Sequence, residues 1–352
     1  MQLNVYSIEQ TKLLEVPRNY KEMFLSNPFL YEDAPFMIKC EDSGITVGSV
    51  YAFPLEITAN NIRYKVCAGS TLTVDEQFRG KGLAKQMTLK RLEISGDNIA
   101  IASGLSNMSF PLFKKLGFSM FLLKRCLLIK KSYPAVKKYF KSNYLSLMVA
   151  SIIDFFIDIW IGILRINNKK KLESCEIEEV SDTPVEVPQI IEQDAHIYKE
   201  NHTYEWFQWV LKGQFNEGDK NKQHLFVIKR NGLIVAFYMT KERYYEKASH
   251  RGFENLVLGS VIEWGVAPGY NISESDLLIN AALSFSKDVD VVEICTSDNV
   301  VSKNLRKNLF LHMGESNFAI KVGDKSPIKD NENINKMTNW RIRPAASDNS
   351  FN

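Results

Sequence analysis

The two halves of this chain repeat one order of predicted strands and helices. The run FMIKCEDSGITVGSVYAF at 36–53 corresponds to FVIKRNGLIVAFYM at 226–239, and Gly69-Ser70 corresponds to Gly259-Ser260, both pairs being 190 residues apart. Leu116-Gly117-Phe118 corresponds to Met313-Gly314-Glu315 at a slightly larger offset. A repeat at a fixed offset indicates a tandem duplication. The alternative is that any two α/β domains share this rhythm of strands.

Each half predicts a mixed β-sheet with flanking helices. In the first half, apolar spacing favours a helix over 80–95, and a short helix over 111–116 ends at Gly117. The predicted strands cover 37–40, 46–53, 56–58, 62–66, 68–74, 99–103 and 118–130. Strands that alternate with helices in this way are typical of an α/β fold. The length of 352 residues suits two such domains.

Composition and spacing exclude several classes of protein. Hydrophobic residues make 45% of the chain and charged residues 24%, which is typical of a globular protein. The net charge of +3 does not favour a nucleic-acid partner. The cysteines form no CxxC pair and the histidines lack metal-ligand spacing, so we expect no metal. The odd, scattered cysteines and the charges near the N-terminus favour a cytoplasmic protein.

An apolar segment, YLSLMVASIIDFFIDIWIGIL at 144–164, lies between the two halves. It is long enough to span a bilayer, but Asp154 and Asp158 disfavour a span. Lysines flank the segment on both sides. We expect a helix that packs between the two domains, with its polar stripe partly wet. The alternative is contact with the inner surface of a membrane, because basic flanks and a broad apolar face suit anionic lipid.

The stretch TLTVDEQFRGKGLA at 71–84 predicts a strand, a glycine-rich turn and a helix. Gly80 and Gly82 allow the backbone to approach a ligand closely, and the helix that follows adds the positive end of its dipole. Arg79 and Lys81 add positive charge. The pattern therefore predicts a pyrophosphate site. It is neither a P-loop nor a dinucleotide fingerprint, because the spacing of the glycines differs.

The run Gln77-Phe78-Arg79-Gly80-Lys81-Gly82 resembles the Gln/Arg-x-x-Gly-x-Gly/Ala signature of the GCN5-related N-acetyltransferases (GNAT). Downstream, residues 107–118, NMSFPLFKKLGF, resemble the short helix of that family that packs against the CoA arm. The resemblance covers residues 30–130 well and the second half weakly. It implies two GNAT-like mixed-sheet domains joined by a long apolar helix.

The resemblance implies that acetyl-CoA is the cosubstrate. Its pantetheine arm would hydrogen-bond the backbone near Leu72 and Val74, and its thioester would slot between two separated strands. The residues expected to bind CoA are Leu72, Val74, Gln77, Arg79, Gly80, Lys81, Gly82, Leu83, Ala84, Asn107 and Phe113.

The second half departs from the signature at the glycines. At the 190-residue offset the two glycines become Tyr270 and Ile272, and a two-residue insertion would make them Ile272 and Glu274. Side chains there would block a close backbone approach, and Glu274 would repel phosphate. We therefore expect one CoA per chain, bound by the first half.

The residues that carry out proton transfer are not identified by the sequence. Phe113 stands where members of the family often have a tyrosine acid, and it cannot donate a proton. Glu56 and Glu263 are weak candidates for the general base, each with a structural alternative as a salt bridge or a solvated strand residue. The aromatic stretch 198–209 predicts either a packed helix or an acceptor pocket.

The expected function is acetyl transfer to the amine of a small molecule. The resemblance extends to tandem proteins of surface-polysaccharide pathways, which makes an amino sugar the expected acceptor. The alternatives are an aminoglycoside or polyamine acetyltransferase and a CoA-binding protein without activity. A homodimer is also compatible with the sequence.

The expected organisation has four segments. Residues 1–131 would form the CoA-binding domain, 132–185 a helical linker, 186–324 the degenerate second domain and 325–352 a polar tail.

Overall fold

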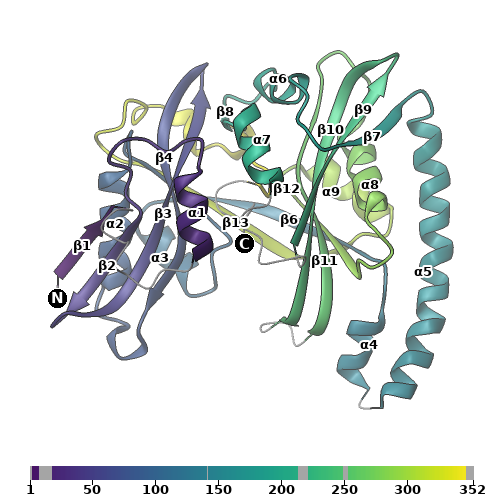
Figure 1. Cartoon of the computed structure of the whole chain (residues 1–352), viewed down its shortest axis with the longest axis horizontal. Coiled ribbons are helices and arrows are strands. Elements are labelled where there is room, and N and C mark those ends of the chain that lie inside the picture. The colour runs from purple at the N-terminus through teal and green to yellow at the C-terminus, as the bar shows by residue number, and fades with distance from the viewer. Residues whose placement is uncertain (1, 8–17, 141, 213–220, 249–252, 346–352) are drawn as a thin grey trace. The chain divides into compact units, whose positions relative to one another are not determined.

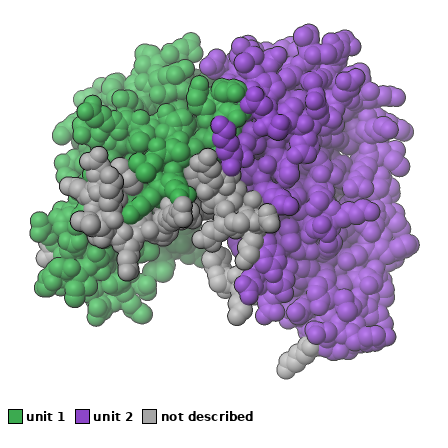
Figure 2. All heavy atoms as spheres, in the orientation of Figure 1, with its two compact units in different colours: residues 1–123, 195–209, 316–352 green, residues 124–194, 210–315 purple. Residues whose placement is uncertain are grey.

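The structure is a computed structural model that describes residues 2–7, 18–140, 142–212, 221–248 and 253–345. The chain forms two compact units, coloured green and purple in Figure 2. Unit 1 consists of residues 1–123, 195–209 and 316–352, and unit 2 of residues 124–194 and 210–315. Neither unit is a continuous segment, so the division differs from the four expected segments.

Unit 1 contains a mixed sheet in which β4 and β5 run parallel and the other neighbours antiparallel. Its strands are, in sheet order, β1 (Gln2–Tyr6), β2 (Met37–Asp42), β3 (Ile45–Ala59), β4 (Ile62–Val74), β5 (Ile99–Ser103) and the end of β13 (Leu311–Val322). The expected strands at 46–53 and 56–58 form the single strand β3, which continues through Pro54. On one edge, β3 pairs with β2 as far as Tyr51 and with β8 from Ile57. Pro54 lies in the gap between these two partners, where a residue without an N–H is tolerated.

Helices cover both faces of the unit 1 sheet (Figure 1). The α2 helix (Leu83–Ile94) packs Leu83 and Met87 against Ile38 and its neighbours. The α1 helix (Arg18–Leu25) packs on the opposite face, where its Phe24 clusters with Met37. Successive strand residues point to opposite faces, which is why adjacent residues of β2 serve different helices. The short α3 helix (Ser109–Lys115) follows β5.

The chain returns to unit 1 twice after leaving it. Strand β8 (Tyr198–Glu200) pairs with β3 and precedes α7 (Tyr204–Leu211), and β14 (Trp340–Arg341) pairs with β8. Trp340 is buried and stacks on Tyr198, with ring centroids 4.8 Å apart. The predicted tail is therefore anchored through this tryptophan. Its last residues, 346–352, lie outside the described part of the chain.

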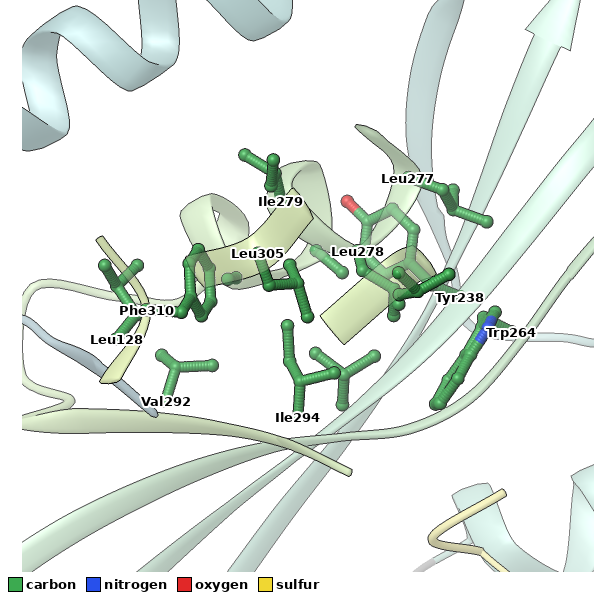
Figure 3. Close-up of a cluster of buried hydrophobic side chains, with 14 of the residues drawn as sticks. Leu128, Tyr238, Trp264, Leu277, Leu278, Ile279, Val292, Ile294, Leu305 and Phe310 are labelled. Carbon is green, nitrogen blue, oxygen red and sulfur yellow. The ribbon is translucent and has the colours of Figure 1, made fainter. Parts of the chain in front are cut away.

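The strands of unit 2 also pair in both parallel and antiparallel directions. They are, in sheet order, the end of β6 (Ser119–Ile129), β12 (Val291–Thr296), β11 (Phe253–Val266), β10 (Leu233–Ala248), β9 (Asn221–Arg230) and β7 (Glu176–Val180). The helices α8 (Glu274–Ser284) and α9 (Asn299–Lys307) follow β11 and β12, and α6 (Glu186–Glu192) precedes β8. Figure 3 shows the core, in which Leu278 of α8 and Leu305 of α9 lie above Ile294 of β12.

Two strands join the sheet formed mainly by the other half of the chain. The end of β6 pairs antiparallel with β12, from Lys124 opposite Thr296 to Ile129 opposite Val291. The end of β13 pairs with β5, from Phe318 opposite Ser103 to Val322 opposite Ile99. This strand exchange is the reason that the compact units are not two consecutive segments.

The apolar segment lies in α5 (Asn143–Lys171), a helix of 29 residues that follows α4 (Tyr133–Tyr139). It is long and apolar enough to cross a membrane by length and composition, and 17% of its most apolar window is buried. Its contacts include α4 and α8 of unit 2. Most of the helix is thus exposed, which differs from the expectation of a helix packed on both sides.

Lys130 gives the stability of unit 2 a pH dependence. Its Nζ donates to the carbonyl oxygens of Phe285 and Ser286, each at 2.7 Å, and burial lowers its pKa from 10.5 to about 8. Because the unfolded chain then binds more protons between these two values, the free energy of unfolding should rise with pH across that window. Denaturant titrations below and above the window test this, with Lys130→Met as the comparison. An equal rise in both proteins would assign the effect to other groups.

Candidate functional site

The turn after β4 has a backbone conformation that favours glycine. Gly80 and Gly82 both have φ of +80°, where L side chains are strained. A Cβ built on either glycine would meet no atom within 4 Å. The backbone of this turn is therefore open to the outside and is not covered by neighbouring side chains.

The N-terminus of α2 follows this turn without a cap. Gly82 is the N-cap residue, offers no side-chain hydrogen bond and is followed by no acidic residue in the first turn. The Gln86 N–H donates to the Gly82 carbonyl at 3.1 Å, so the N–H groups of Leu83 and Ala84 precede the hydrogen-bonded ladder of the helix. These donors and the helix dipole favour an anion at this position.

Positive side chains surround the turn. Arg79 Nε donates to the Val74 carbonyl at 3.2 Å, and Lys81 Nζ lies 4.5 Å from the centroid of the Phe78 ring. Both cations and Gln77 are exposed. The turn thus combines backbone donors with mobile positive charge, which together suit a pyrophosphate.

Strands β4 and β5 separate as they approach this turn. They pair only at Cys67 with Ala100 and at Ala68 with Ile101, although β4 continues to Val74 and β5 to Ser103. The separated ends expose the edge of β4. The resemblance predicted such a separation, and a substrate arm could take the place of the missing strand contacts.

A bulge sets the direction of the β4 backbone at this edge. The register with β3 shifts between Ser49 and Tyr51, and Thr71 has φ of +51°, which is strained for a β-branched residue. Beyond the bulge the Asp75 N–H donates to Val47 on β3 at 3.0 Å. The backbone N–H and C=O groups of successive strand residues point to alternate edges, so those of Leu72 and Val74 point to the open edge of β4 and not to β3. They are the two residues expected to contact the pantetheine arm.

A cavity of about 230 Å³ lies between the separated strands and the helices α2 and α3. Val50, Gly69, Thr71, Leu72, Thr88, Arg91, Ala102, Ser103, Gly104, Leu105, Ser106, Ser109 and Phe113 line it. Its wall is mostly apolar or hydroxylic and contains no carboxylate among these residues. It therefore suits a neutral, slender group better than a cation.

Arg91 brings a buried positive charge to this cavity. Its side chain is 1% exposed, and Nη1 donates to the Ile101 carbonyl at 2.9 Å. Gly69 makes room for it, because a Cβ at this position would lie 1.7 Å from Nη1. The guanidinium thus fills the space that a larger strand residue would take.

The α3 helix supplies one further wall of the cavity. Phe113 is buried, lines the cavity and packs edge-on against Phe118, with ring centroids 4.7 Å apart. Gly117 has φ of +75° and ends the helix. Asn107 is exposed in the turn before α3 and does not line the cavity.

The corresponding turn in unit 2 has a different chemistry. Ser273 is the N-cap residue of α8 and therefore corresponds to Gly82, the N-cap residue of α2. The offset between these two residues lies between the two offsets that the sequence suggested. The Ser273 hydroxyl accepts from the Asp276 N–H at 3.1 Å, and Trp264 Nε1 donates to Glu274 at 2.5 Å. A capped helix with two carboxylates in its first turn repels an anion.

The serine cap of α8 has a measurable effect on stability. Ser273→Ala removes the hydrogen bond to the Asp276 N–H and should lower the free energy of unfolding by about 1 kcal/mol. Urea denaturation measures the loss. Ser174→Ala, at an exposed serine in the turn after α5, is a suitable control, and an equal loss there would mean that the cap contributes nothing specific.

The two parallel strands of unit 2 that correspond to β4 and β5 pair over more residues than β4 and β5 do. Strands β11 and β12 pair from Leu258 with Val291 to Val261 with Ile294. This range includes Gly259, the counterpart of Gly69, whose missing side chain makes room for Phe285. The paired strands and the phenylalanine occupy the space that is a cavity in unit 1.

Neither predicted base is among the residues that line the cavity. Glu56 is on β3 in unit 1, where it accepts a hydrogen bond from Asn201 and lies 3.7 Å from Arg63 Nε. Six residues of strand, about 20 Å, separate it from Val50 in the cavity wall. Glu263 is fully buried on β11 in unit 2 and accepts from the Trp264 N–H at 2.8 Å. Neither assignment as a base is tested by these positions.

Other reactive side chains have structural surroundings. His202 stacks on Trp206 with centroids 3.7 Å apart, and its Nε2 lies 3.2 Å from buried Glu200. The predicted aromatic stretch therefore mainly packs α7 into unit 1. Burial raises the pKa of the Cys67 thiol on β4 to about 11, which disfavours it as a nucleophile. No cluster of potential metal ligands occurs within the described residues.

Sequence reasoning did not identify Arg91 or Thr71. A signal for Arg91 exists, because it follows Leu83 and Met87 at four-residue intervals on the buried face of α2. Thr71 has no such signal, since its positive φ depends on the register between β3 and β4.

The fold of the chain is similar to that of several solved structures. N-myristoyltransferase of Saccharomyces cerevisiae with bound myristoyl-CoA has 14% sequence identity and a TM-score of 0.53, over 91% of this chain and 82% of that one. Eis1 of Mycobacterium abscessus has 10% identity and a TM-score of 0.50, over 92% and 74%. A GCN5-related N-acetyltransferase of Anabaena variabilis has 10% identity and a TM-score of 0.51, over 91% and 73%.

These similarities concern structure and not sequence. No protein-family model and no curated protein matches the sequence. The structural matches each extend over both units, and the low identities limit them to the fold. The chain therefore has the fold of the GCN5-related N-acetyltransferases.

Proposed function

We propose that this protein is an N-acetyltransferase that uses acetyl-CoA and acts on the amine of a small molecule. One observation carries the proposal: an uncapped helix N-terminus follows two glycines of positive φ, at the end of a strand that has separated from its neighbour. The structural matches support acyl transfer in general, because they include acetyltransferases and a myristoyltransferase.

The turn and the open edge of β4 would bind two parts of the same cosubstrate. The N–H groups of Gly82, Leu83 and Ala84 would hold the pyrophosphate, with Arg79 and Lys81 at its rim. The backbones of Val74 and Leu72 would bind the arm along the edge. An N–H near the Thr71 bulge would stabilise the oxyanion that forms when the amine attacks the thioester carbonyl.

The cavity favours a short acyl group. Its volume is about 230 Å³, it must also admit the end of the pantetheine arm, and Arg91 fills its inner side. A long acyl tail that extended past this position would have to displace the guanidinium and leave its buried charge without the hydrogen bond to the Ile101 carbonyl. Acetyl is the acyl group that avoids this.

The acceptor is proposed to be an uncharged or singly charged amine such as an amino sugar. The residues that line the cavity include no carboxylate, whereas a polyamine or an aminoglycoside would gain from several. The attacking amine must lose a proton to a base within hydrogen-bond reach, a condition that Glu56, about 20 Å along β3 from the cavity wall, does not meet.

We further propose that the two halves arose by duplication and that only the first binds CoA. The order of three strands, helix, strand, helix and strand occurs from β2 to β6 and again from β9 to β13. The capped, acidic N-terminus of α8 and the paired strands β11 and β12 support the loss of the second site.

Calorimetry with acetyl-CoA, followed by an assay of thiol release with a panel of amines, tests the function. We expect one binding site per chain and release of free CoA that requires an amino sugar. Two sites would contradict the loss of the second site. Absence of binding would remove the basis of the proposal, and binding without release for any amine would favour a CoA-binding protein without activity.

A further inference from the structure

The exposed side of α5 is more apolar than is typical of a helix at the surface of a soluble protein. The residues that face unit 2 recur at intervals of three and four and include three polar ones, Ser146, Asp154 and Asn168. These polar groups have partners: Asp154 accepts from the Ser132 N–H at 2.7 Å, and Asn168 Nδ2 donates to the Asp276 carbonyl at 2.9 Å. The helix is therefore fixed to the rest of unit 2 along one side, through these polar groups and through the buried Ile161 and Leu164.

The exposed side of α5 is a continuous apolar stripe. Phe155 and Phe156 are 62% and 64% exposed, and the stripe follows the helix at intervals of three and four residues. We call it the apolar stripe; it consists of Leu145, Met148, Ile152, Phe155, Phe156, Ile159, Ile163 and Ile166. At 1.5 Å per residue it is about 32 Å long. A soluble surface rarely presents an apolar patch of this extent.

Basic and aromatic residues lie at the ends of the stripe. Lys169 and Lys170 are exposed in the last turn of α5. Lys137 and Lys138 lie on α4, where Lys137 is 3.6 Å from Glu254 and Lys138 is over the Phe253 ring. The exposed aromatic residues Tyr139, Phe140 and Tyr144 are near the same end. Such residues are typical of helices at the boundary between headgroups and acyl chains.

We propose that α5 is a docking surface for an anionic membrane, on which it lies flat with its apolar stripe inserted. Acidic headgroups would neutralise both basic ends at once, while the acyl region would cover the stripe between them. Within the stripe there is no charged side chain, since Asp158 and Arg165 lie along its edge. This proposal does not depend on the acetyltransferase function.

Two other occupants fit the same helix less well. A second copy of the chain would bring like charges together, because both ends are basic and either a parallel or an antiparallel pair of α5 helices would place lysines beside lysines. A transmembrane orientation would detach Asp154 and Asn168 from unit 2 and place two aspartates in hydrocarbon.

Flotation of the purified full chain with vesicles tests the proposal. We expect binding to phosphatidylcholine vesicles that contain phosphatidylglycerol and weaker binding to pure phosphatidylcholine. The double variant Phe155→Glu/Ile159→Glu should lose more than about tenfold in the vesicle partition coefficient, because both side chains insert. Lys169→Glu/Lys170→Glu should weaken binding to the anionic vesicles selectively.

The control replaces an exposed apolar residue elsewhere in unit 2. Leu233 on β10 is 63% exposed, and Leu233→Glu should float as the wild type does. Circular dichroism checks that every variant is folded. The proposal would be overturned if the double glutamate variant floated as well as the wild type does. It would also be overturned if the wild type did not float.

Two further outcomes assign the stripe to the other occupants. A dimer by light scattering that the double variant dissociates, without vesicle binding by the wild type, would identify a second copy as the occupant. Resistance of the bound protein to extraction by alkaline carbonate would indicate a span. Each of these results would overturn surface docking, whereas binding that carbonate reverses supports it.

Discussion

Gly82→Glu should abolish the binding of acetyl-CoA while the protein remains folded. The substitution places a carboxylate at the uncapped N-terminus of α2, where the pyrophosphate is expected. Two like charges about 4 Å apart near a surface repel by about 4 kcal/mol, which is more than a hundredfold in affinity. Calorimetry with acetyl-CoA measures this loss.

Gly269→Glu is the matched control for this variant. Gly269 has φ of +85°, no atom lies within 4 Å of its added Cβ, and it lies in the turn before α8. A side chain at positive φ destabilises both variants by a similar amount, about 1 kcal/mol, so the strain is matched. The control should bind acetyl-CoA normally. Equal affinities in the two variants would mean that the turn before α2 is not the anion site.

Arg91→Ala should extend the range of acyl groups that the enzyme accepts. It removes the side chain that fills the inner side of the cavity next to Gly69. Each additional buried methylene contributes about 0.8 kcal/mol, so a hexanoyl tail that enters the opened space should gain about tenfold or more in kcat/KM relative to acetyl. Rates with acetyl-CoA and hexanoyl-CoA measure the ratio.

Arg91→Met separates the effect of volume from that of folding. Methionine fills a similar space without charge, so this variant should keep the preference for acetyl-CoA. Both variants leave the Ile101 carbonyl without its bond to Arg91 and should lose a comparable amount of stability, about 1–3 kcal/mol. A ratio of rates in Arg91→Ala that equals the wild-type ratio would remove Arg91 from the determinants of acyl length.

The local features of the site could be predicted from the sequence, because local residue types determine them. Gly80 and Gly82 predicted a turn whose backbone a ligand can approach closely, and both have positive φ with no atom within 4 Å of an added Cβ. The strand before them and the helix after them were also predicted. The helix of the second half begins one residue away from the simple offset, because the turns differ in length and no spacing rule fixes that difference.

Features that depend on long-range contacts could not be predicted. The separation of β4 and β5 was implied only by the family resemblance, and the arginine that sets the inner side of the cavity, two turns into α2, was not expected. The polar edge of α5 is partly exposed, as expected, but most of its apolar face is exposed too, because the contacts that fix the helix come from Ser132 and Asp276, which are distant in the sequence. The partners of β6 and β13 are likewise invisible to local patterns.

The strand exchange has a consequence for how such a gene can change. A chain truncated after 131 would leave β5 without β13, and a chain that began at 186 would leave β12 without β6. Each fragment would then present an open sheet edge, which promotes aggregation. A half that has lost its ligand, as proposed for the second half, would therefore remain under selection as a folding partner of the half that keeps one. Chemistry at α8 could then be lost without deletion of the sequence around it.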